Sequence, residues 1–79
     1  MLSVSSSKQV AQLVRMANQI ALNMSAWGSE ADVARKTEEH ITKFWTPDMR
    51  RRLQDYSEQG GEDLSPAVLR VLDSLARTH

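Results

Sequence analysis

Apolar residues recur three and four positions apart along most of this chain, the spacing that places side chains on one face of an α-helix. The pattern predicts helices over about residues 8–27, 29–46, 47–58 and 65–77. No segment shows the two-residue alternation typical of a strand. We therefore predict an all-α fold, a small bundle of four short helices, with residues 1–7 as a flexible N-terminal segment and 8–79 as a single helical domain.

Each predicted helix has a set of residues that should face a common core. They are Val10, Leu13, Val14, Ala17, Ile20, Ala21 and Met24 in the first helix, Val33, Thr37, His40, Ile41 and Phe44 in the second, Met49, Leu53 and Tyr56 in the third, and Val68, Val71, Leu72 and Leu75 in the fourth, with Leu69 on the flank. Isolated helices of this length are marginally stable in water, so their stability must come mainly from packing.

Glycine, proline and serine mark the predicted helix boundaries. Gly28 is expected to end the first helix in the left-handed conformation, and Ser29 to cap the second. Because so few residues connect these two helices, they should form a tight hairpin that we expect to be antiparallel. Pro47 suits the first position of the third helix, and Gly60-Gly61 should break the chain after it.

Composition excludes several classes of function. The chain has no cysteine, which rules out disulfides, iron–sulfur ligation and thiolate zinc sites. Its formal net charge of zero argues against nucleic-acid binding, which usually needs a basic excess. No stretch is apolar enough for a signal peptide or a membrane span, so a cytoplasmic location is the default expectation. A domain of 79 residues has a modest core, and support from a partner chain is a reasonable expectation.

No arrangement of residues predicts catalysis, a cofactor site or a metal site. The chain has no nucleophile elbow and no glycine-rich phosphate loop. His40 lacks the glutamate three positions earlier that a di-metal carboxylate bundle would need, because that position is Thr37. We interpret His40 as a core or interface histidine, with a catalytic or proton-relay role as the alternative.

Two short runs resemble a known family. They are residues 16–20, Met-Ala-Asn-Gln-Ile, and residues 40–50, His-Ile-Thr-Lys-Phe-Trp-Thr-Pro-Asp-Met-Arg. Together they resemble the delta subunit of the NAD-dependent, molybdenum-containing formate dehydrogenases, a family of short all-helical chains. The resemblance covers about residues 13–68, and its specific part is the second run, with Trp, Pro, Met and Arg at fixed offsets behind a His.

The resemblance implies a non-catalytic accessory subunit of a formate dehydrogenase complex. Larger subunits of such a complex would hold the molybdenum cofactor, the iron–sulfur clusters, the flavin and the NAD site, and this chain would hold no cofactor. Its helical surface would dock on a larger subunit and help assembly, cofactor insertion or stability. The sequence does not decide among these three roles.

We predict that the partner-binding residues are Trp45, Pro47, Met49 and Arg50, with Asn18 and Gln19 joining from the first helix. Trp and Arg are enriched where protein partners bury surface. Trp45 has two interpretations, a cover over the turn at Pro47 or an anchor on a partner, and one ring could serve both. Consecutive arginines on a helix point in three directions, and Arg50 should lie on the flank of the third helix, nearly free of intrachain packing.

Two other classes of function stay open. The chain could be a stand-alone helical interaction module or a homodimeric regulator, and a homo-oligomer is possible when it is isolated. It could also be a small all-α enzyme that uses Arg50, Arg51 and Arg52 on an anionic substrate, although no paired acid or base accompanies them. Neighbouring genes for large molybdenum and flavin subunits, or co-purifying proteins, would favour the accessory subunit.

Overall fold

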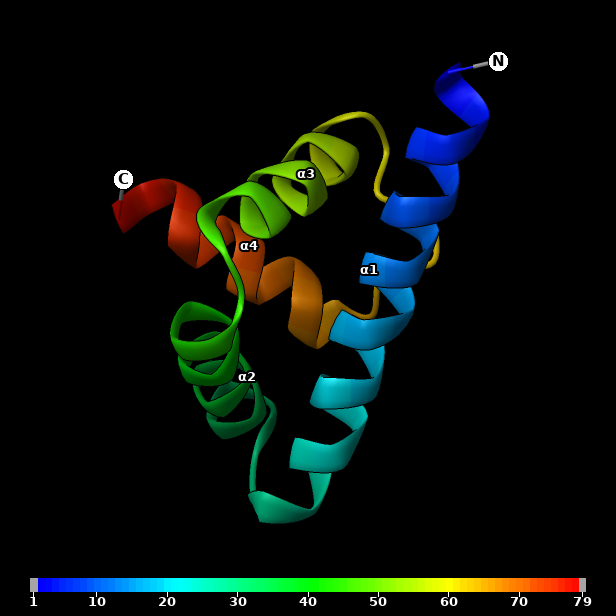
Figure 1. The fold of residues 1–79 in the computed structure, drawn as a ribbon. Helices are drawn as coiled ribbons and strands as arrows, with labels where there is room; N and C mark the ends of the chain where they lie inside the picture. The colour runs from blue at the N-terminus through cyan, green and yellow to red at the C-terminus, as the bar shows by residue number, and fades with distance from the viewer. Residues whose placement is uncertain (1, 79) are drawn as a thin grey trace.

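The computed structural model describes residues 2–78, with side chains for residues 8–26 and 28–77. This part of the chain forms α1 (Leu2–Met24), the 3-10 helix η1 (Ser25–Trp27), α2 (Glu30–Phe44), α3 (Pro47–Glu58) and α4 (Pro66–Thr78), and contains no strand. Figure 1 shows α2 running back beside α1 after the tight connection. α4 packs against each of the other three helices. The predicted all-α fold with four helices is confirmed.

Both ends of α1 differ from the prediction. The helix begins at Leu2 instead of near residue 8, and its last turn is the separate 3-10 helix η1. The serine-rich start has no apolar periodicity, so the pattern could not predict helix there. No proline or glycine interrupts it, however, and serine is only moderately unfavourable in a helix. The division into a flexible segment 1–7 and a domain 8–79 stays a prediction.

A capping box starts α2. The Ser29 hydroxyl accepts a hydrogen bond from the Asp32 backbone N–H at 3.3 Å, and the Asp32 carboxylate accepts one from the Ser29 backbone N–H at 3.4 Å. Gly28 has φ +149° and ψ −151°, a region open essentially to glycine, and not the predicted left-handed helical conformation. A Cβ at Gly28 would come within 2.7 Å of an Asp32 carboxylate oxygen, so the missing side chain makes room for the cap.

The core confirms most of the predicted inward positions. Its buried apolar residues are Leu13, Val14, Ala17, Ala21, Val33, Ala34, Ile41, Trp45, Leu53, Leu64, Val68, Val71, Leu72 and Leu75. Thr37 is fully buried, and its hydroxyl donates to the Val33 carbonyl at 2.7 Å. Leu69 is 43% exposed, as its predicted place on the flank requires. Ala34 and Leu64 are core residues that the sequence analysis did not select.

The prediction that Phe44 faces inward is wrong, because its side chain is 65% exposed. Its neighbour Trp45 fills the interior instead and is only 6% exposed. Trp45 leaves the helix in an extended conformation, with φ −89° and ψ 145°. This change of backbone direction turns the indole inward at the point where helical spacing would have selected Phe44. His40, predicted on the same buried stripe, lies at its edge and is half-buried.

Candidate functional site

A junction with hydrogen-bonded helix ends joins α2 to α3 within the second sequence run. The Trp45 backbone N–H donates to the Ile41 carbonyl at 2.9 Å and completes the last turn of α2. The Thr46 hydroxyl accepts from the Met49 backbone N–H at 3.1 Å and caps α3. Pro47 is the first residue of α3, as predicted. With its indole buried, Trp45 matches the interpretation of a cover over this turn, and the alternative of a partner anchor stays a prediction.

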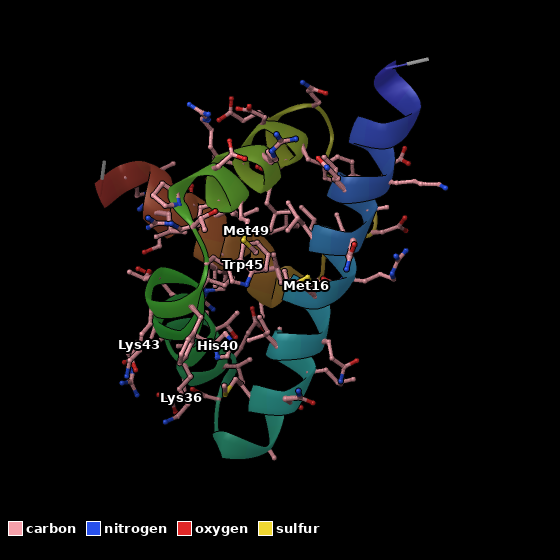
Figure 2. The ribbon with its side chains drawn as sticks, viewed as in Figure 1. Met16, Lys36, His40, Lys43, Trp45 and Met49 are labelled. Carbon is pink, nitrogen blue, oxygen red and sulfur yellow. The ribbon has the colours of Figure 1, made fainter. Side chains whose placement is uncertain are left out.

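The fold brings the two sequence runs together. Met16 of the first run and Met49 of the second line one hollow between α1 and α3. Figure 2 shows Met16, Trp45 and Met49 gathered where α1, α2 and α3 meet. Met16 is 38% exposed and Met49 is half-buried, so both side chains reach the surface.

A second hollow lies along the same side of α1. It is lined by Met24 together with His40, Lys43 and Phe44 of α2. The rings of His40 and Phe44 are stacked at a tilt of 48° with centroids 4.8 Å apart, and the Lys43 ammonium lies 5.8 Å from the Phe44 centroid.

Both hollows are partly apolar, and each takes a methionine from α1. Met16 and Met24 are eight positions apart on α1, which places them on neighbouring parts of one helix face. We call the surface made by Met16, Met24, His40, Phe44 and Met49 the methionine face.

Asn18 and Gln19, both predicted to bind a partner, have different surroundings. The Asn18 amide donates to the Asp63 carbonyl at 2.6 Å and accepts from the Ser65 backbone N–H at 2.9 Å. Asn18 therefore ties α1 to the connection between α3 and α4. Gln19 is exposed and donates only to the Asn23 side chain, at 3.0 Å. An internal bond from Asn18 to the adjoining helix was one alternative in the sequence interpretation, but the partners, Asp63 and Ser65, could not be predicted because nothing local shows what lies opposite Asn18.

Two of the three arginines of α3 share one carboxylate, and the third, Arg50, lines a pocket beside α4. Arg51 and Arg52 both reach Asp48, at 3.1 and 2.8 Å. The hydrogen bond from Arg52, and then that from Arg51, lowers the pKa of Asp48 below its usual 3.8. Arg52 also donates to the Gln9 side chain at 3.0 Å and so links α3 to α1.

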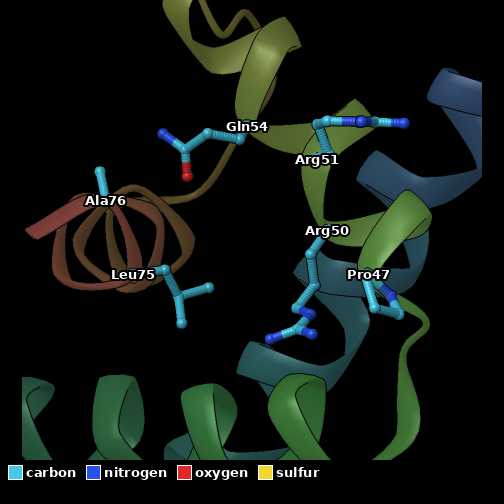
Figure 3. Close-up of a pocket in the computed structure, with 6 residues that line it drawn as sticks. All are labelled: Pro47, Arg50, Arg51, Gln54, Leu75 and Ala76. Carbon is cyan, nitrogen blue, oxygen red and sulfur yellow. The ribbon is translucent and has the colours of Figure 1, made fainter. Parts of the chain in front are cut away.

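The prediction that Arg50 is nearly free of intrachain packing is wrong. Its side chain is half-buried, and its Nε is fully buried with no hydrogen-bond partner among the described residues. Arg50 lines a pocket between α3 and α4 with Pro47, Arg51, Gln54, Leu75 and Ala76, as Figure 3 shows. The periodicity of α3 alone could not predict this burial, because it depends on where α4 packs.

The part of the chain described by the structure offers no obvious catalytic or metal centre. Among these residues, no cluster of three or more His, Asp or Glu side chains could hold a metal ion. His40 stacks on Phe44 and has no acid or hydroxyl partner within the described residues. No helix in this part of the chain is long and apolar enough to cross a lipid bilayer.

The fold is that of a small four-helix protein in which the residues of the two sequence runs surround the junction between α2 and α3. Comparison with known proteins identifies its family. Residues 12–72 match the family described as "NADH-dependant formate dehydrogenase delta subunit FdsD". The match spans most of the chain, and the chain belongs to this family. No curated protein and no solved structure matches the chain.

Proposed function

We propose that this chain is a non-catalytic accessory subunit of a cytoplasmic NAD-dependent formate dehydrogenase complex and docks on one of its larger subunits. Family membership supports the association with formate dehydrogenase. The observation that carries the docking role is the convergence of the two sequence runs on the methionine face, beside the buried Trp45.

The methionine face has the composition of a protein contact. Methionine side chains are flexible and polarisable, so they adapt to the shape of a partner, and methionine and aromatic residues are enriched at interfaces. Phe44, at 65% exposure, presents a large ring that the described part of the chain leaves largely uncovered. The capped junction at Thr46 and Pro47 holds this surface in one shape before binding, which lowers the entropic cost of association.

The residues present suit a supporting role better than a chemical one. Without cysteine the chain cannot ligate an iron–sulfur cluster. The redox cofactors expected in this family would therefore reside in the larger subunits, and the chain would aid their assembly, cofactor insertion or stability. Asn18, Gln19, Trp45, Pro47, Met49 and Arg50 stay our predicted partner-binding residues, now joined by His40 and Phe44.

The test is to produce the larger subunits with and without this chain. We expect the purified chain alone to form no NADH from formate and to carry no molybdenum, iron or flavin. We expect the larger subunits produced with it to show higher formate-dependent NADH formation or higher cofactor content. Stoichiometric redox cofactor in the isolated chain, or larger subunits that are identical in both respects without it, would contradict the proposal.

A further inference from the structure

Arg50 is a half-buried cation for which the described part of the chain provides no acceptor. Its two neighbours share the carboxylate of Asp48, whereas the Arg50 side chain makes no ion pair or hydrogen bond with the described side chains, those of residues 8–26 and 28–77, or with the described backbone. Its Nε is fully buried. Leaving a buried donor unpaired typically costs about 1–3 kcal/mol, and more for a charged group. The isolated chain thus retains an unfavourable feature, a charged and half-buried guanidinium without a partner among the described residues.

The pocket around Arg50 has the shape and chemistry for a side chain that is acidic at its tip. Its volume is about 320 Å³, and no acidic residue lines it. Pro47, Leu75 and Ala76 supply apolar walls, while Arg50, Arg51 and Gln54 supply polar groups. In Figure 3 the guanidinium of Arg50 lies between Pro47 and Leu75.

A carboxylate is the acceptor that matches this donor. A guanidinium presents its N–H groups in a rigid planar fork, and the two oxygens of a carboxylate can accept from that fork in parallel. The two terminal nitrogens of Arg50 present such a fork, while the Nε–H behind them is buried. The apolar walls can contact the methylene groups of an aspartate or glutamate, a contact that a small inorganic anion does not make.

We propose that this pocket receives an aspartate or glutamate side chain of the larger subunit and that Arg50 binds its carboxylate. This inference rests on the proposed docking function and specifies the chemistry of one contact. Pro47 lines this pocket at the start of α3, two residues before Met49, which faces α1 from another side of the same helix. Arg51 lines the same pocket but is already paired with Asp48, and its side chain is 74% exposed.

The test compares Arg50→Gln with Arg51→Gln, two neighbouring changes that each remove one positive charge. The dissociation constant for the purified larger subunits should rise about 10-fold or more for Arg50→Gln and change about 3-fold or less for Arg51→Gln. The thermal midpoint of isolated Arg50→Gln should not fall, so weaker binding would not reflect unfolding. Arg50→Lys keeps the charge but not the fork, and it should restore binding only in part.

A second measurement uses acetate as the probe. In the isolated chain, the NMR signal of the Arg50 Nε–H should shift on addition of sodium acetate more than on addition of sodium chloride at equal ionic strength. If acetate shifts this signal but Arg50→Gln binds the larger subunits like the wild type, the pocket is a site for free anions and the proposed protein contact is wrong. If acetate has no effect and Arg50→Gln binds normally, the carboxylate site itself is wrong and the docking function stands. If the wild-type chain does not bind the larger subunits, both proposals fail.

Discussion

The side chain of Asn18 is bonded at 2.6 Å to the backbone carbonyl of Asp63, 45 positions further along the chain. Asp63 has φ +69°, a left-handed conformation that is uncommon for a residue other than glycine. The same amide accepts from the Ser65 backbone N–H just before α4. Asn18 thereby holds a strained turn and sets where α4 begins, and α4 supplies the centre of the core.

We predict that Asn18→Ala lowers the free energy of unfolding by about 1–3 kcal/mol, because the change leaves a part-buried backbone donor unpaired. Gln19→Ala is the matched control, since Gln19 is exposed and bonds only to the nearby Asn23 side chain. That control should change stability by about 0.5 kcal/mol or less. Urea unfolding followed by circular dichroism measures both, and equal effects of the two changes would contradict the internal role of Asn18.

Trp45 and Phe44 are adjacent aromatic residues with opposite surroundings, at 6% and 65% exposure. Trp45→Ala should cost about 3–5 kcal/mol by leaving a large cavity, which is similar to the whole net stability expected of so small a core. We therefore expect the isolated Trp45→Ala chain to be largely unfolded. Phe44→Ala should cost about 1 kcal/mol or less, mainly through the lost contact with His40. Similar unfolding midpoints for the Trp45→Ala and Phe44→Ala variants would show that Trp45 does not support the junction.

Phe44 also tests the methionine face, with Leu22 of α1 as a matched control. Leu22 is 64% exposed. Because it is two positions from Met24 on the same helix, its side chain points well away from this face. We predict that Phe44→Ala weakens binding to the larger subunits by about 1–2 kcal/mol or more, the scale of an interface hot spot. Leu22→Ala should leave binding unchanged. Isothermal titration calorimetry measures both, and the reverse order would assign docking to the other side of α1.

Acid should destabilise the fold through Asp32 and Asp48. Hydrogen bonds from Arg35 and Ser29 lower the pKa of Asp32 below 3.8, and those from Arg52 and Arg51 do the same for Asp48. Because the folded-state pKa values lie below the unfolded ones, the stabilisation is present above the unfolded pKa and is lost as the pH falls through the folded values. We expect these groups to contribute a fall in thermal midpoint that begins below about pH 4.

The doubly substituted Asp32→Asn/Asp48→Asn chain should therefore lose less of its thermal midpoint than the wild type between about pH 7 and pH 3. Asp55→Asn is the control, because the Asp55 carboxylate is exposed and forms no ion pair or hydrogen bond with the side chains that the structure describes. The carboxylates of Asp32 and Asp48 are exposed, so added salt should reduce the difference in acid dependence between the double variant and the wild type. Identical acid dependence in the double variant and the wild type would contradict the prediction.

The fold was largely predictable because local signals agreed with one another. Helical periodicity gave the four helices, and the serine and proline at Ser29 and Pro47 gave two of their starts. The errors arose where the backbone leaves regular geometry. Phe44 points outward and Trp45 inward because the Trp45 backbone is extended, a change that helical spacing cannot represent.

The candidate site was less predictable, because its features depend on segments that are distant in sequence. The residues of both runs were identified, but the roles of Asn18 and Arg50 depend on Asp63, Ser65 and the position of α4. A polar residue outside the apolar face of a helix produces the same sequence pattern whether its side chain is solvated or hydrogen-bonded to a distant loop. The partner-binding roles themselves stay predictions.

Native mass spectrometry of a formate dehydrogenase complex, purified through a tag on a larger subunit, tests the central claim most directly. Our account predicts that the intact complex contains this 8.9 kDa chain in a fixed ratio and releases it on activation in the gas phase. A complex of the same composition whether or not the chain is co-produced, with the chain found only as free monomer or homodimer, would contradict the account.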